Sequence, residues 1–218
     1  MYFFVKSFLV AAVLCAVSFA PVRAEIFYIE DPVNGFSLSF PDLWAKVNNQ
    51  KADDKLTVVG PGQNDFATCR VRVREDRRHL IYPRKFASAI QKVEYSKDFW
   101  TDYLGEYDEV EVEVFKDEAG LGKGFASYAE VSYMTAEGPL VRKRGIMFAA
   151  LYNDRAYIAD CSSEKSVYAK WRPVFLSIVK SVDFDKTIAE FPTGYYRDFS
   201  KDPELLINGP NPLSPDRY

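Results

Sequence analysis

The sequence is poor in the residues that most often build catalytic and metal centres. It has one histidine and three cysteines in 218 residues. It contains no Cys-x-x-Cys pair, no His-Glu-x-x-His sequence, no Gly-x-Ser-x-Gly turn and no calcium-loop pattern. Each of those motifs holds ligands or a nucleophile at the spacing that its chemistry needs. We therefore expect no catalytic residue, no metal and no other cofactor.

The chain also has no excess of positive charge. It carries 28 basic and 31 acidic residues, a formal net charge of −3 at pH 7. Binding to DNA, RNA or anionic lipid depends on a basic field that displaces counterions. We therefore expect no nucleic-acid partner, and any function of the basic residues has to be local.

No apolar run is long enough for a comfortable membrane span. The longest, FLVAAVLCAVSFA at residues 8–20, falls short of the ~20 residues that a spanning helix needs. Lys6 precedes it and the small-residue exit Val22-Arg23-Ala24 follows, a pattern typical of a secretory signal peptide. We predict a signal peptide over residues 1–24, export to the periplasm or outside the cell, and no stable membrane insertion after cleavage. A retained anchor is the alternative.

Residues 25–186 are expected to form one domain rich in strands. Two apolar-rich runs, 26–30 and 36–40, flank Asn34-Gly35 and predict a hairpin. Further strands are predicted over 55–60 and 68–74, where apolar residues alternate with polar ones. Four more alternating runs follow between 107 and 161, with turns expected at 117–120, 136–139 and 153–154.

Helical spacing appears in two regions. Phe86, Ile90 and Val93 recur at helical spacing, and residues 98–105 continue as a second helical segment. A last helix is expected to begin near Ser162 or Ser163, and one apolar stripe along it is formed by Val167, Trp171, Phe175 and Ile178. Residues 181–184, Ser-Val-Asp-Phe, are predicted to add a short final strand.

The stretch NGFSLSFPDLWAKV, residues 34–47, supports a family resemblance. It contains a glycine, an alternating strand and a Pro-Asp-x-Trp corner, and a helix, a meander, a Trp-bearing helix and SVDF follow it. This order of elements resembles PsbP and Mog1-like domains over roughly residues 26–185. The resemblance implies an α+β fold in which an antiparallel sheet is flanked by helices as an α/β/α sandwich. It also implies a non-catalytic module that docks on larger complexes.

The basic stretch ATCRVRVREDRRH, residues 67–79, has more than one interpretation. Its arginines 70, 72 and 74 share one strand face, and glutamates 109, 111 and 113 share a face of a later strand. Opposite charges on paired strands stabilise a sheet by ~0.2–1 kcal/mol each. We therefore expect the arginines to form a solvated ladder with those glutamates or simply to be exposed to solvent; an anion-binding surface is the alternative.

Cys69 and Cys161 are the two cysteines that remain after the first 24 residues. Both lie in strand-like segments, and an exported protein reaches a compartment that favours oxidation. A disulfide between them is predicted, with two separately buried thiols as the alternative.

Two short groups of residues remain as candidates for partner contact. Arg77, Arg78 and His79 follow the regular alternation of their strand. The segment 187–218 is rich in proline and glycine and carries Tyr195, Tyr196 and Phe199 without a periodic face to join. This tail either wraps the domain or stays free for a partner.

The function predicted from the sequence is a non-catalytic exported module that binds or assembles with a protein partner in the cell envelope. Two alternatives stay open. One is a hydrolase that uses carboxylates and His79 with a metal, and the other is a carrier of a small apolar ligand with a cavity between sheet and helix.

Overall fold

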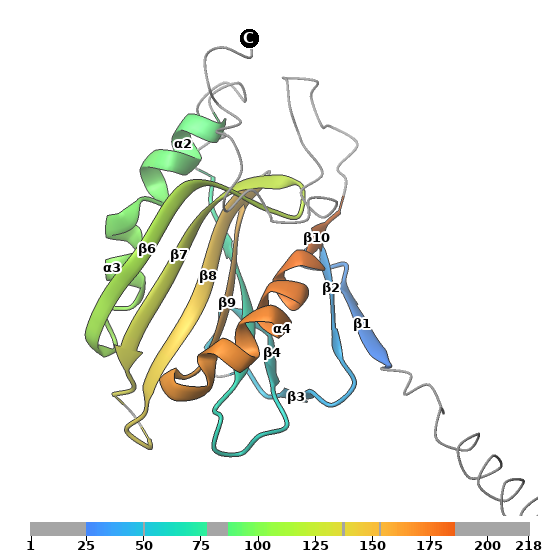
Figure 1. The fold of residues 1–218 in the computed structure, drawn as a ribbon. Coiled ribbons are helices and arrows are strands. Elements are labelled where there is room, and N and C mark those ends of the chain that lie inside the picture. Colours follow the sequence, from blue (N-terminus) through green and yellow to red (C-terminus); the bar gives the residue numbers. More distant parts are fainter. Residues whose placement is uncertain (1–24, 50, 78–86, 137, 153, 186–218) are drawn as a thin grey trace, which may run out of the picture.

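The computed structural model describes residues 25–49, 51–77, 87–136, 138–152 and 154–185; nothing is stated about the side chains of residues 87, 88 and 118. The expected signal peptide and tail lie outside these residues. So do Arg78, His79, Tyr195, Tyr196 and Phe199. The described residues form two antiparallel sheets and three α-helices, which confirms the predicted α+β class (Figure 1).

The larger sheet has seven strands in the order β3-β4-β5-β9-β8-β7-β6. Their bounds are β3 Ala45–Val47, β4 Asp54–Val59, β5 Thr68–Glu75, β6 Asp108–Leu121, β7 Gly124–Met134, β8 Arg142–Tyr152 and β9 Arg155–Glu164. The smaller sheet has three strands in the order β1-β2-β10: β1 Ile26–Asp31, β2 Phe36–Pro41 and β10 Asp183–Phe184. The short final strand predicted from Ser-Val-Asp-Phe is therefore present.

The first hairpin forms as its turn chemistry predicts. Gly35 has a φ of +69°, a conformation that residues with a Cβ rarely adopt. The Asp31 carboxylate accepts the backbone N–H of Asn34 at 3.0 Å and closes the turn. Phe36, Leu38 and Phe40 alternate inward along β2, so the predicted buried face is confirmed.

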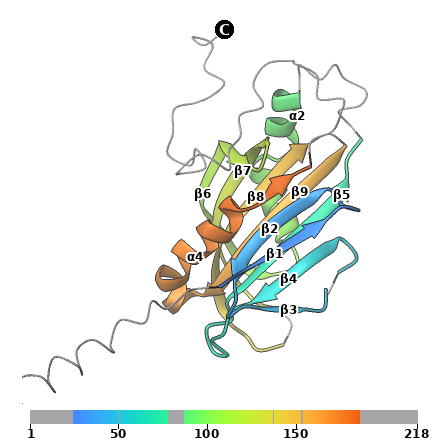
Figure 2. The same cartoon turned by 90° about the vertical axis from the view of Figure 1, so that its right-hand side faces the viewer.

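The helices lie on opposite sides of the large sheet. α2 (Ala87–Glu94) and α3 (Lys97–Tyr103) cover β6, β7 and β8, while α4 (Tyr168–Lys180) packs on the other side against β8 and β9 (Figure 1). Figure 2 shows the small sheet beside α4, over the β4–β5–β9 part of the large sheet. The arrangement is helix, sheet and helix, and each side of the sheet has its own buried apolar core.

Two expected boundaries are wrong. β9 runs on to Glu164, and a single 3-10 turn (Lys165–Val167) separates it from α4. Ser162 and Ser163 are buried ladder residues, because pairing with β8 continues as far as Lys143 opposite Glu164 and outweighs their local preference for a helix start. The stripe Trp171, Phe175 and Ile178 is buried as predicted.

The turn expected at residues 117–120 lies a few residues later. β6 pairs with β7 through Leu121, so the chain turns at Gly122 and Lys123. Gly122 has a φ of +54°, and a Cβ there would lie 3.0 Å from the ring of Phe184. On α2, Val93 is 73% exposed, which corrects its expected place on the apolar stripe.

Candidate functional site

The arginines of β5 do not meet the glutamates of β6, so the expected solvated ladder is wrong. β5 lies between β4 and β9, and β6 is the far edge strand of the sheet. Arg70 and Arg72 are buried, at 9% and 1% exposure. They point to the side of the sheet that α3 covers, where carboxylates from the two neighbouring strands offset the cost of burying their charges.

Arg70 is paired with an aspartate of β9. Its Nε lies 2.9 Å from Asp160 Oδ1, and the hydroxyl of Tyr103 on α3 donates to Asp160 Oδ2 at 2.6 Å. Burial alone would raise the pKa of Asp160, but Arg70, Arg72 and the Tyr103 hydroxyl outweigh it and hold that pKa below its usual range. The Asp160 carboxylate is therefore an ion-paired, doubly hydrogen-bonded anion.

Arg72 is paired with an aspartate of β4. Its Nε lies 2.7 Å from Asp54 Oδ1, and both side chains are almost fully buried. The guanidinium also lies over the ring of Tyr103, 5.0 Å from its centroid. Burial and the Asp160 charge raise the pKa of Tyr103 well above its usual value, so its hydroxyl stays a neutral donor. We call Asp54, Arg70, Arg72, Tyr103 and Asp160 the arginine cluster.

The glutamates of β6 pair with β8 instead. Glu109 forms an ion pair with Arg142, and Glu113 forms one with Arg144. Both arginines come from the strand next but one to β6 in the sheet, so the carboxylates reach across β7.

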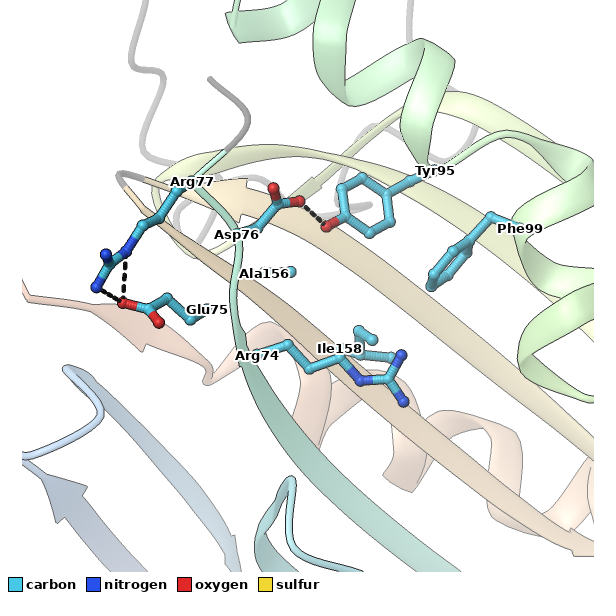
Figure 3. A pocket seen from close by; sticks show the side chains of 8 residues that line it. All are labelled: Arg74, Glu75, Asp76, Arg77, Tyr95, Phe99, Ala156 and Ile158. Atoms are coloured by element: carbon cyan, nitrogen blue, oxygen red, sulfur yellow. Dashed lines mark hydrogen bonds and ion pairs between the residues drawn. The ribbon is translucent and has the colours of Figure 1, made fainter. Parts of the chain in front are cut away.

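One end of the arginine face opens into a pocket of about 480 Å³, which we call the Tyr95 pocket (Figure 3). It is lined by Arg74, Glu75, Asp76, Arg77, Tyr95, Phe99, Ala156 and Ile158. The Tyr95 hydroxyl donates to the buried Asp76 carboxylate at 2.7 Å, which ties the end of α2 to the residue after β5. The Tyr95 and Phe99 rings meet edge to face at 4.8 Å.

Charged residues form the rim of this pocket. Arg77 Nε donates to Glu75 Oε1 at 2.8 Å, and Arg74 Nε donates to Asp53 Oδ2 at 2.6 Å. Figure 3 shows the Arg77–Glu75 pair pointing away from the two aromatic rings. The sequence singled out Arg77, whereas Tyr95, Phe99 and Ile158 were missed. The signal for Tyr95 and Phe99 was the helical segment after residue 83, and that for Ile158 was an alternating strand. A single sequence does not reveal that the helices turn Tyr95 and Phe99 toward β9 and the end of β5.

The opposite end of the same face holds a second cavity of about 310 Å³, which we call the Lys143 pocket. Lys143 and Arg70 lie in its wall, and Lys51 and Glu106, which form an ion pair, also line it. Apolar surface comes from Val47, Val59 and the rings of Tyr107 and Tyr133.

The other side of the large sheet is apolar and filled. The Sγ atoms of Cys69 and Cys161, which lie opposite each other on β5 and β9, are 2.09 Å apart as a disulfide. The space next to it, bounded by Leu38, Ile178 and other apolar residues, measures only about 10 Å³. That volume is close to the least that holds one water molecule, so this space is too small for the apolar ligand of a carrier.

The described ranges contain neither a metal-ligand cluster nor a membrane-spanning helix. There, no group of three or more His, Cys, Asp and Glu residues is placed to hold a metal ion. None of the helices in the same ranges is long and apolar enough to cross a membrane. The hydrolase alternative rested on His79, which lies outside the described residues.

Proteins with a similar fold are found among solved structures. No protein-family model and no curated protein matches this chain. Among solved structures, cyanobacterial PsbP (CyanoP) from Synechocystis sp. has a TM-score of 0.49 and 12% identity over 76% of this chain and 96% of that chain. The Ran-binding protein Mog1p of Saccharomyces cerevisiae has a TM-score of 0.47 and 7% identity, covering 74% and 96%.

A third solved structure is LpqN, involved in cell envelope biogenesis of Mycobacterium tuberculosis, with a TM-score of 0.40 and 12% identity over 75% of this chain and 92% of that chain. The PsbP/Mog1-like resemblance of the sequence is thus found again among solved structures. At these identities and TM-scores, no partner or activity is carried over from these proteins.

Proposed function

We propose that this protein is a non-catalytic, exported binding or assembly module that docks on a larger complex of the cell envelope. The observation that carries the proposal is the Tyr95 pocket, which combines an apolar interior with a charged rim. An apolar interior takes an anchoring side chain, and charged groups around it fix the partner's orientation.

The interior of the pocket suits an apolar anchor. Ala156 and Ile158 of β9 form its floor, and Tyr95 and Phe99 form a wall. Ala156 and Ile158 belong to the sheet and Phe99 to α3. Tyr95 directly follows α2 and is held by its hydrogen bond to Asp76, so the pocket is preformed. Its volume of about 480 Å³ lies within the ~300–1,000 Å³ range of known binding pockets.

The rim suits an acidic neighbour of that anchor. The side chains of Arg77 and Glu75 are 69% and 60% exposed, so their ion pair contributes only ~0–1 kcal/mol. A carboxylate of the partner can replace Glu75 at little cost. We therefore propose a protein segment with an aromatic or aliphatic anchor in the pocket and an Asp or Glu that reaches over the rim to Arg77, whose side chain points away from Tyr95 and Phe99.

The arginine cluster between the two pockets has a supporting role in this proposal. Both oxygens of Asp160 are engaged, by Arg70 and by Tyr103, and Asp54 is engaged by Arg72. Groups held in this way are suited to positioning α3 over the sheet rather than to transferring protons. Export through residues 1–24, and contact through Arg78, His79 and the tail, remain parts of the proposal.

Site-specific photo-crosslinking in the native envelope tests the surface. A crosslinking amino acid at position 77 is expected to capture a defined envelope protein, and the same amino acid at position 140 serves as control because Leu140 is 75% exposed in a loop between β7 and β8. Phe99→Ala, which removes part of the pocket wall, should reduce capture from position 77, whereas Leu140→Ala should not. Equal capture from both positions, or full capture with Phe99→Ala, would overturn the proposed surface.

Deletion of residues 187–218 tests the tail separately. If Tyr195, Tyr196 and Phe199 contact the partner, the truncated protein should recover less of the crosslinked protein in a pull-down from envelope extracts. Unchanged recovery would remove the tail from the contact surface and leave the Tyr95 pocket as its basis.

A further inference from the structure

Lys143 is a half-buried cation without a partner of its own. It lies on β8, on the side of the sheet that α3 covers. Among the described residues, no hydrogen bond or ion pair joins its ammonium group. Glu164 lies opposite Lys143 in the ladder, yet its carboxylate accepts the Ser166 hydroxyl. A buried ammonium that lacks a counter-charge costs free energy.

The charged groups around Lys143 leave a local deficit of negative charge. Arg70 of β5 lies in the same cavity wall, and its own counter-charge is Asp160 of β9. Lys51, which precedes β4, and Glu106, which follows α3, neutralise each other. Burial and then the Arg70 charge lower the pKa of Lys143 to about 8, and Asp160 opposes them only in part.

The rest of the cavity has apolar walls with phenol groups. The rings of Tyr107 and Tyr133 lie 4.4 Å apart, and Val47 and Val59 from β3 and β4 also line the cavity. The Tyr107 hydroxyl accepts from Arg70 at 3.3 Å, and the Tyr133 hydroxyl donates to Ser162 at 3.0 Å. Both hydroxyls are thus engaged in the wall, and their rings offer apolar surface.

We propose that the Lys143 pocket is a binding site for a small organic carboxylate, with its anionic group on Lys143 and its apolar body against Tyr107 and Tyr133. A volume of about 310 Å³ suits a compact ligand of this kind. The site lies at the other end of the arginine face from the Tyr95 pocket, so it does not rest on the docking proposal.

Calorimetric titration of the exported protein with benzoate tests the site, since benzoate combines a carboxylate with a flat apolar body. Benzamide has nearly the same shape without the charge, and inorganic phosphate and acetate have a charge without the apolar body. We expect benzoate to bind at least tenfold more tightly than each of these three. Equal binding of benzamide, or tighter binding of phosphate, would overturn the assignment of a carboxylate.

Two lysine variants locate the site. Lys143→Gln keeps a polar side chain, one atom shorter, and removes its charge, and it should weaken benzoate binding at least tenfold. Lys46→Gln is the matched control: Lys46 is exposed on β3 next to Val47, and adjacent side chains of a strand point to opposite faces. It should change the dissociation constant by less than twofold. Full binding by Lys143→Gln would contradict the site.

The pH dependence of the unaltered protein provides a readout that does not depend on the folding of a variant. A bound carboxylate favours the charged form of Lys143 and so raises its pKa above about 8. Benzoate should therefore bind more weakly as the pH rises through 8, and binding near pH 8 should take up protons, measured by titration in buffers of different ionisation enthalpy. Binding without proton uptake and without this pH dependence would overturn the role of Lys143.

Discussion

The two faces of strand β5 are both buried, but in different ways. On the α4 side, Cys69 and its apolar neighbours pack into a continuous core. On the α3 side, Arg70 and Arg72 are buried through ion pairs with Asp160 and Asp54. The comparison shows that strand alternation divides the residues between two faces without telling which face meets water.

The two faces should respond differently to substitution. The apolar face shares its stabilisation among many contacts, such as those of Trp44 with Trp171 and Phe175. On the arginine face, each charge depends on one or two partners. Removal of a single partner there leaves a buried charge uncompensated.

The largest effect is expected from loss of the disulfide on the apolar face. Cys69 and Cys161 are 92 residues apart in the sequence, and in the chain-entropy model closing a loop of that length stabilises the fold by ~4–5 kcal/mol. Cys69→Ala with Cys161→Ala should lower the free energy of unfolding by about that amount in urea denaturation. The reduced, unsubstituted protein is the control and should lose a similar amount; full stability after reduction would contradict the prediction.

The next largest loss of stability is expected when a buried ion pair of the arginine face is broken. Asp54→Ala leaves Arg72 buried without its carboxylate and should cost ~3–5 kcal/mol of unfolding free energy. Arg72→Met combined with Asp54→Leu removes both charges and should cost clearly less than Asp54→Ala alone. If the double variant is as unstable as Asp54→Ala, side-chain packing and not charge pairing determines the stability of the arginine face.

A smaller loss of stability is expected when the pH is lowered. The pKa of Asp160 is lowered in the folded protein, so the stability that its charge contributes is fully present above its unfolded value of about 3.8 and is lost as the pH falls through the folded value. Unfolding free energy measured from pH 6 down to pH 2 should therefore fall most steeply below pH 4. Asp160→Asn should make the unfolding free energy less dependent on pH below pH 4. An unchanged slope would show that other carboxylates cause the loss of stability in acid.

The smallest effect is expected at the exposed end of β5. Arg74 pairs with Asp53, but its side chain is 44% exposed. Arg74→Ala should change the unfolding free energy by only ~0–1 kcal/mol, because water replaces an exposed partner. If Arg74→Ala lowered the unfolding free energy as much as Asp54→Ala, the exposed ion pair would contribute as much stability as the buried one.

Local chemistry predicted the parts of the fold that depend on neighbouring residues. Asn34-Gly35 predicted the first hairpin, and alternation along β2 and β5 assigned side chains to the correct faces. The sequence did not reveal that β5 pairs with β9 instead of β6. Asp160 stands between the apolar residues Ala159 and Cys161 of β9, so no charge stripe marks it as the partner of Arg70.

The candidate sites were harder to predict because tertiary structure assembles them. Arg77 stood out through its place after a strand. Tyr95 and Phe99 join it only because α2 and α3, which pack on β6, β7 and β8, bring these two side chains next to β9 and the end of β5. Lys143 lies in a basic run that looks like an exposed strand, and its burial results from residues far away in the sequence. Helical spacing predicts a buried side for such helices, but not what that side covers.

Hydrogen–deuterium exchange of the protein, with and without a partner captured by crosslinking at position 77, tests the central claim most directly. The proposed docking surface predicts slower exchange on partner binding at residues 74–77 and 95–103, which surround the Tyr95 pocket, and no change in α4. Slower exchange confined to α4 or to the β1–β2 hairpin would contradict it.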